Sequence, residues 1–113
     1  MVATLRIADL ETSIAVSANI LAKRINLRMH PHNAPCLVVT GIDRCTLANG
    51  HVLDWGAPAL PATLTTPELT EIQSAGAKCD AAEAQRPAVM PLPSSGQAVV
   101  VAYAAACAGV PAN

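Results

Sequence analysis

The sequence predicts an α+β fold in which two helices pack on a small antiparallel sheet. Three observations favour this class: apolar residues recur at helical spacing near the N-terminus, Asn49-Gly50 separates two apolar runs, and three adjacent valines begin at Val99. The chain has 113 residues, which is enough for one domain and too few for two. We therefore expect a single domain over residues 1–113.

The first predicted helix spans residues 9–29. Its apolar residues recur every three or four positions and would form one stripe: Leu10, Ile14, Ala18, Leu21 and Ile25. Asp9 is placed to cap the start of this helix, and Pro31 is placed to stop it. A cluster of basic residues near its end would suit the helix dipole, so it needs no nucleic-acid partner: Lys23, Arg24 and Arg28.

Strands are predicted between residues 36 and 55. The run Cys36–Thr40 is short and rich in β-branched residues, and a hairpin is predicted to follow it. Asn-Gly between apolar runs is the strongest local hairpin signal, because a type I′ turn needs positive φ at both central residues. A two-residue loop at Asn49-Gly50 would pair Arg44 with Trp55 and lay the guanidinium over the indole.

A second helix is predicted over residues 66–86, after a proline-containing connector at 56–64. Thr66 suits the N-cap and Pro67 the first helical position, while Pro87 ends the helix. Its apolar stripe would consist of Leu69, Ile72, Gly76 and Cys79.

The segment 87–113 contains no charged residue. Its prolines predict an extended start, Ser94-Ser95-Gly96 predicts a turn, and residues 97–107 suit a strand or an alanine-rich helix. An edge strand without charges would be free to pair with other strands. We therefore expect this segment to be paired, either within the domain or at an interface with another subunit.

The charge content restricts the classes of partner. Charged residues make up 13% of the chain, about half of the usual ~25%, so a bland or partner-covered surface is expected. A net charge of −1 and 2% aromatic residues exclude the usual nucleic-acid surfaces. The longest apolar run, Ala98–Val110, is too short to span a bilayer, and the N-terminus does not resemble a signal peptide. These observations predict a protein that lies in the cytoplasm, or in a particle assembled there, and has no membrane partner.

A metal site is one hypothesis for the His-rich region. His30, His32 and Cys36 could supply ligands to zinc or copper, with Cys45 or His51 completing the set. The spacing matches no zinc-finger pattern. A thiol–imidazole pair from Cys36 or Cys45 with His51 would be needed for nucleophilic catalysis, but its usual sequence surroundings are absent.

The remaining chemical groups have ordinary structural explanations. The cysteines form no C-x-x-C pair and are expected as small reduced core residues: Cys36, Cys45, Cys79 and Cys107. Paired carboxylates for acid–base chemistry could come from Asp43 and Asp54, which may face each other across the hairpin base, or from Glu68 and Glu71 on one helix face. Their neighbours give no reason for a shifted pKa, so all four are expected to be solvated. No phosphate-binding glycine motif occurs. We therefore assign no catalytic, cofactor-binding or metal-binding residue and expect no cofactor.

These observations favour a non-catalytic structural or assembly subunit that associates through the uncharged segment 87–113. In composition the chain is similar to small subunits of repetitive assemblies such as virion or shell proteins. Two alternatives stay open. One is a small metal-binding protein or enzyme that uses His30, His32 and Cys36, and the other is an inhibitor-type module that binds another protein.

Overall fold

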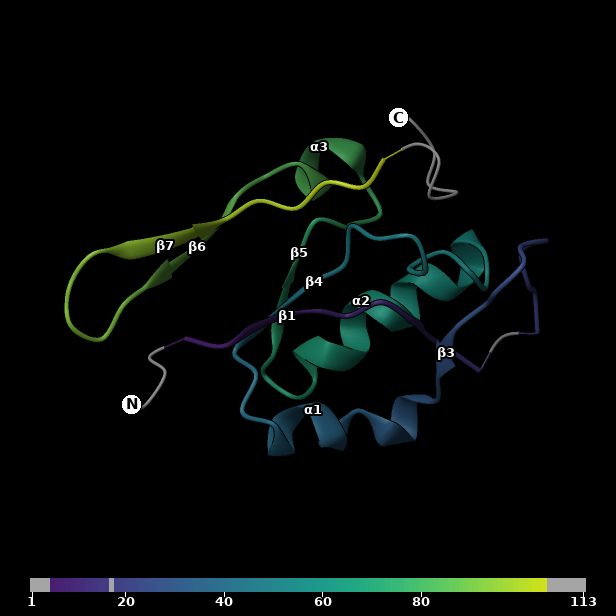
Figure 1. Ribbon diagram of the computed structural model, residues 1–113, viewed down its shortest axis with the longest axis horizontal. Coiled ribbons are helices and arrows are strands. Elements are labelled where there is room, and N and C mark those ends of the chain that lie inside the picture. The colour runs from purple at the N-terminus through teal and green to yellow at the C-terminus, as the bar shows by residue number, and fades with distance from the viewer. Residues whose placement is uncertain (1–4, 17, 106–113) are drawn as a thin grey trace.

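In the computed structural model, which describes residues 5–16 and 18–105, short helices and strands are interspersed along the chain (Figure 1). The predicted mixture of α and β structure is confirmed. The central sheet has the strand order β1-β4-β5, formed by Ile7–Asp9, Arg44–Thr46 and Gln73–Ala75. All neighbouring strands in this sheet are parallel.

The predicted antiparallel sheet around Asn49-Gly50 is therefore wrong. β4 ends at Thr46, and neither Asn49 nor Gly50 has the positive φ that a type I′ turn needs. The Asn49 side chain instead turns back toward β1, where its Nδ2 donates to Asp9 Oδ1 and to Leu10 O, both at 2.9 Å.

The predicted helix over residues 9–29 is also wrong. In its place β2, Ser13–Ile14, pairs in parallel with β3, Arg28–Met29, and the described residues between them form neither helix nor strand. Leu10 and Ile14 do enter the core, but they do so from extended backbone. The other three residues of the expected stripe, Ala18, Leu21 and Ile25, are exposed, and Ile25 is 60% exposed.

Two helical segments replace the strand predicted over residues 36–40. A 3-10 turn, Pro31–Asn33, leads into helix α1, Pro35–Val39. Pro35 lies in the first turn, where its fixed φ favours a helix and its missing N–H is not needed. Leu37 alone in α1 is buried, so β-propensity of the valines is overridden by the proline and by this single core contact.

Helix α2 covers Leu60–Glu68 and follows a 3-10 turn at Ala57–Ala59, where a connector was predicted. The predicted helix over residues 66–86 is interrupted, because β5 intervenes before a short helix α3 at Ala81–Ala84. Asp80 caps α3 by accepting from the backbone N–H of Glu83 at 3.1 Å.

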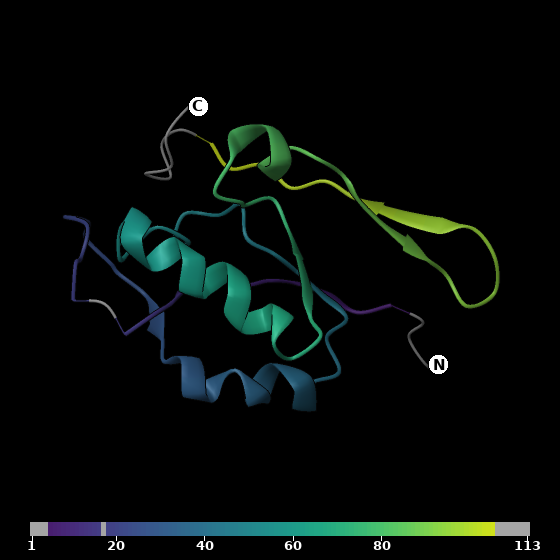
Figure 2. The ribbon, with the colours of Figure 1, turned by 180° about the vertical axis from the view of Figure 1, so that it is seen from behind.

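The uncharged segment forms a hairpin rather than a helix. β6, Ala88–Pro91, pairs antiparallel with β7, Gln97–Val100, so only the start of residues 97–107, which suited a strand or a helix, is a strand. The predicted turn at 94–96 lies between β6 and β7. The hairpin projects from the body of the molecule in both views (Figures 1 and 2). The last part of the predicted interface segment, residues 106–113, lies outside the described residues.

Apolar clusters occupy both faces of the central sheet. Cys45 of β4 belongs to the larger cluster, together with Leu10, Ile14, Leu37, Leu47, Val52, Leu64 and Ile72. Ala75 of β5 belongs to a smaller cluster with Met90 and Val100 of the hairpin. Helices α1 and α2 lie on one side of the sheet, and α3 and the hairpin lie on the other (Figure 2).

Gly76 closes the end of β5 against neighbouring backbone. It has a φ of 89°, and a Cβ at this position would lie 2.7 Å from the Cβ of Ala102 and 2.8 Å from that of Ala48. Only glycine satisfies both requirements. The segment that follows β7 can thus pass close to the carboxyl end of the central sheet.

Candidate functional site

Polar side chains gather where β1 and β4 end. Asp9 is the last residue of β1, and its Oδ1 accepts hydrogen bonds from Thr46 Oγ1 at 3.0 Å and from Asn49 Nδ2 at 2.9 Å. Asn49 is buried, and its Oδ1 accepts from the His51 backbone N–H at 3.0 Å. Binding sites of parallel sheets commonly lie outside the carboxyl ends of the strands. We call this group the polar cluster; it comprises Asp9, Lys23, Asn49, His51 and Asp54.

Asp54 is the charged centre of the polar cluster, and its side chain is fully buried. Its Oδ1 accepts from Lys23 Nζ at 2.6 Å. Its Oδ2 accepts from the Leu27 backbone N–H at 2.7 Å and lies 2.6 Å from His51 Nδ1. Burial acts to raise the pKa of Asp54, but the hydrogen bonds from Lys23, His51 and Leu27 outweigh it and bring the pKa below its ordinary value.

Contacts from distant parts of the chain hold the loop that carries His51. Ser13 of β2 is fully buried, and its Oγ donates to His51 O at 3.0 Å and Val52 O at 2.9 Å. Lys23 Nζ donates to Gly50 O in addition to Asp54. The imidazole therefore projects from a loop that is fixed on both sides.

This arrangement defines the protonation geometry of His51. Because an ionised carboxylate only accepts hydrogen bonds, the contact with Asp54 requires a proton on Nδ1, whose N–H donates a hydrogen bond to Oδ2. Nε2 is then the nitrogen that can accept or release a proton. The side chain is 23% exposed, so the ring is oriented by a buried group and still reaches solvent. The polar cluster can thus perform acid–base chemistry.

We expect the stabilisation provided by Asp54 to disappear in acid. A carboxyl group whose folded pKa is lowered stabilises the protein fully above its unfolded pKa of about 4, and that stabilisation is lost as the pH falls through the folded value. Denaturation by urea, measured between neutral pH and about pH 2, should show a larger loss for the wild type than for Asp54→Asn. Parallel curves for the two proteins would contradict this expectation.

The structure divides the histidines and cysteines of the predicted metal site. His30 Nδ1 accepts from the His32 backbone N–H at 3.2 Å, and the two rings lie 4.7 Å apart. Cys45 is instead buried in the larger apolar cluster, and His51 pairs with Asp54. Among the described residues, no three His, Cys, Asp or Glu side chains are placed to hold a metal ion.

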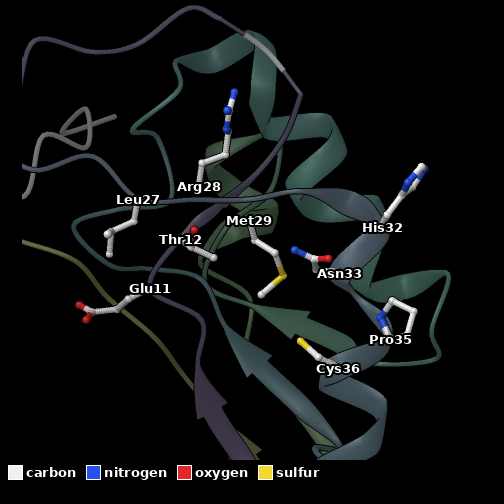
Figure 3. A pocket seen from close by; sticks show the side chains of 9 residues that line it. All are labelled: Glu11, Thr12, Leu27, Arg28, Met29, His32, Asn33, Pro35 and Cys36. Atoms are coloured by element: carbon white, nitrogen blue, oxygen red, sulfur yellow. The ribbon is translucent and has the colours of Figure 1, made fainter.

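His32 and Cys36 do line one cavity, of about 760 Å³, between the β3 region and α1. Figure 3 shows Met29, Asn33 and Cys36 directed toward this cavity, whereas the His32 ring points away from it. The cavity is separate from Cys45 and combines one thiol with one thioether and one amide. It therefore does not assemble the donor set that the sequence indicated.

The prediction of core cysteines is correct for Cys45 only. Its thiol is fully buried, and burial, with a smaller contribution from the charge of Asp9, raises its pKa, which makes it a poor nucleophile. Cys36 and Cys79 are exposed, contrary to the prediction. Cys107 lies outside the described residues.

The interpretation of Asp54 as a solvated carboxylate is wrong. Asp43, its expected neighbour, accepts instead from the Arg6 backbone N–H at 2.7 Å. The cation over Trp55 is Arg28, at 4.2 Å from the ring centroid, rather than Arg44. Three polar residues that follow an apolar run, Asn49, His51 and Asp54, were the feature of the sequence that could have indicated the site.

The solvated assignment does hold for two other carboxylates. Glu68 and Glu71 are both exposed, and Glu68 pairs with Lys78 at 3.3 Å. Within residues 5–16 and 18–105, no helix has the length and apolar character required to cross a membrane.

Comparisons with known proteins address the function directly. The family model described as "Bacterial capsule synthesis protein PGA_cap" matches residues 2–113. Two proteins named "Probable polyglutamine synthesis accessory protein", from Mycobacterium tuberculosis strains CDC 1551 / Oshkosh and ATCC 25618 / H37Rv, are each 35% identical over 104 residues. The aligned region is 91% of this chain and 27% of each relative. The chain thus spans about a quarter of the length of the curated relatives that it matches.

These matches correct the functional expectation from composition. They are to capsule and polyglutamine synthesis proteins, so the assignment as a structural or assembly subunit of a virion-like or shell-like complex is wrong. The alternatives of a metal-binding enzyme at His30, His32 and Cys36 and of an inhibitor-type module are overturned by the same matches. With nearly all of its residues matched, the chain belongs to the bacterial capsule synthesis protein PGA_cap family.

Proposed function

We propose that this chain is part of an accessory protein in the synthesis of a bacterial capsule polymer of the polyglutamine type. The family match over residues 2–113 carries the proposal, and the names of the two mycobacterial relatives supply the polymer class. An accessory role implies protein partners, namely the proteins that make the polymer. The uncharged segment 87–113 is the part of the chain that we expect to contact them. Location in the cytoplasm and absence of nucleic-acid binding stay predictions from the sequence.

The polar cluster is the proposed place of action. Its position at the carboxyl ends of two parallel strands, the buried charge of Asp54 and the fixed ring of His51 support this assignment. Synthesis and processing of an amide polymer require proton transfer to or from nitrogen and oxygen atoms. Nε2 of His51 would exchange that proton, while Asp54 orients the ring.

We expect His51→Gln, introduced into the gene that encodes this chain in its own host, to lower the amount of cell-associated polymer strongly. Loss of a group that transfers protons typically slows a reaction by roughly 10²–10⁴-fold. Polymer is measured as glutamate released by acid hydrolysis of washed capsule material. His32→Gln is the matched control, because His32 is exposed and lies outside the polar cluster.

The two parts of the proposal fail separately in this experiment. Normal polymer in His51→Gln would exclude the acid–base role of His51. Normal polymer after deletion of the whole gene would exclude the capsule function itself.

A further inference from the structure

A second polar cavity lies at the opposite end of the central sheet from the polar cluster. Its volume is about 510 Å³, and Arg44 and Gln73, the first residues of β4 and β5, are on its wall. The remaining lining residues come from β5 and the segments that flank it: Glu68, Glu71, Ser74 and Lys78.

Arg44 brings a buried positive charge to this cavity. The residue is only 5% exposed, its Nε donates to Met90 Sδ at 2.8 Å, and its Nη2 donates to Gln73 Oε1. Both acceptors are uncharged, and in the described part of the chain Arg44 takes part in no ion pair. Burying a charge is unfavourable unless an opposite charge compensates it. Further guanidinium N–H groups are available for a carboxylate that enters from outside.

Among the other charged side chains that line the cavity, one carboxylate has no ion-pair partner within the described residues. Lys78 Nζ lies 3.3 Å from Glu68 Oε1, so these two neutralise each other. Glu71 is exposed on the same cavity and forms no ion pair within the described residues. Its φ of 64° is the left-handed conformation that residues with a Cβ rarely adopt. This conformation ends helix α2, since the Glu71 N–H donates to Glu68 O and the Ile72 N–H donates to Pro67 O, both at 3.0 Å.

We infer that this cavity binds a free α-amino acid, with its carboxylate on Arg44 and its ammonium group on Glu71. The unpaired charges of opposite sign match the two charged ends of such a ligand, and the Gln73 amide offers a hydrogen bond to its side chain. The choice of glutamine or glutamate as the amino acid rests on the proposed function. The charge complementarity does not.

Isothermal titration calorimetry of the 113-residue chain with L-glutamine and L-glutamate tests this inference. We expect binding that Arg44→Met weakens by roughly tenfold or more, since a charge-assisted bond to a carboxylate is lost. Glutamine whose α-carboxylate is converted to a carboxamide also lacks the contact with Arg44. Its affinity for the wild type should therefore be as low as the affinity of free glutamine for Arg44→Met. N-acetylglutamine has no ammonium group and so cannot pair with Glu71. It should therefore bind the wild type and Glu71→Gln with equal affinity.

Controls separate loss of the site from loss of the fold. Arg24→Met removes an exposed cation outside the cavity and should leave binding unchanged. If circular dichroism shows that Arg44→Met is unfolded, Arg44→Lys and Glu71→Gln replace it, and each should weaken glutamine binding. Absence of wild-type binding to both amino acids, or equal binding of the carboxyl-blocked form, would overturn the inference. A failure here that leaves the polymer loss in His51→Gln intact removes this site and keeps the proposed function.

Discussion

Replacing Asp54 by alanine is expected to lower the free energy of unfolding by about 3–5 kcal/mol, the usual cost of removing one partner from a buried ion pair. The substitution removes the acceptor for Lys23, His51 and the Leu27 backbone N–H together. It also leaves the Lys23 ammonium group, whose side chain is 25% exposed, beside an apolar methyl group. Urea denaturation of the wild type and the variant at neutral pH measures the difference.

Asp80→Ala is the matched control for this substitution. Asp80 is exposed and caps α3 with one hydrogen bond of 3.1 Å, so its loss should cost about 1 kcal/mol. Lys23→Met provides a second comparison, since the double variant with Asp54→Ala should be less destabilised than the sum of the single variants. If Asp54→Ala costs no more than Asp80→Ala, Asp54 does not hold the 49–55 loop in place.

Leu47→Ala is expected to have the second large effect, a loss of about 2–5 kcal/mol in the free energy of unfolding. Leu47 is fully buried in the larger apolar cluster, directly after β4. Truncation removes apolar contacts and leaves a cavity that the surrounding strands and helices can close only in part. The same urea denaturation experiment measures the loss.

A leucine at the surface serves as the comparison. Leu69 follows α2 and is 85% exposed, so Leu69→Ala should change stability by less than about 0.5 kcal/mol. Similar effects of the two substitutions would mean that Leu47 does not lie in a packed core.

Among the local elements, the sequence signals predicted the C-terminal hairpin correctly. Val99, Val100 and the turn residues Ser94-Ser95-Gly96 lie within one hairpin, so the residues that decide its structure are close together in the chain. The prolines also had local effects, although Pro35 began a helix where a strand was expected. In each case the outcome depends on neighbours within a few residues.

The central sheet could not be derived in this way. Ile7 pairs with Arg44 and Arg44 pairs with Gln73, and a parallel pair of strands has no turn motif that would mark its register. Leu10 and Ile14 are four residues apart and therefore suggested a helix. Their spacing instead reflects two short strands that reach the same core from different positions.

The candidate site was hidden for a similar reason. His51 and Asp54 are close in the sequence. The other groups that donate hydrogen bonds to the Asp54 carboxylate belong to Lys23 and Leu27, which are 31 and 27 residues away. Judged from its own neighbours, Asp54 was an ordinary surface carboxylate. The low charge content of 13% suggested a covered surface, yet Arg44 and Asp54 show that part of this small charge is inside the molecule.

The pairing of β1 with β4 has a consequence for synthesis on the ribosome. β1 leaves the ribosome first, but its hydrogen-bonding partner lies 37 residues further along the chain, as the Asp9–Thr46 contact shows. During that interval the backbone groups of β1 have no partner strand in this sheet. Among the described strands, those of the β6–β7 hairpin emerge last and close over a much shorter loop, so they can pair at once. Of the strands of the central sheet, β1 therefore stays unpaired longest during synthesis, until all of β4 has left the ribosome.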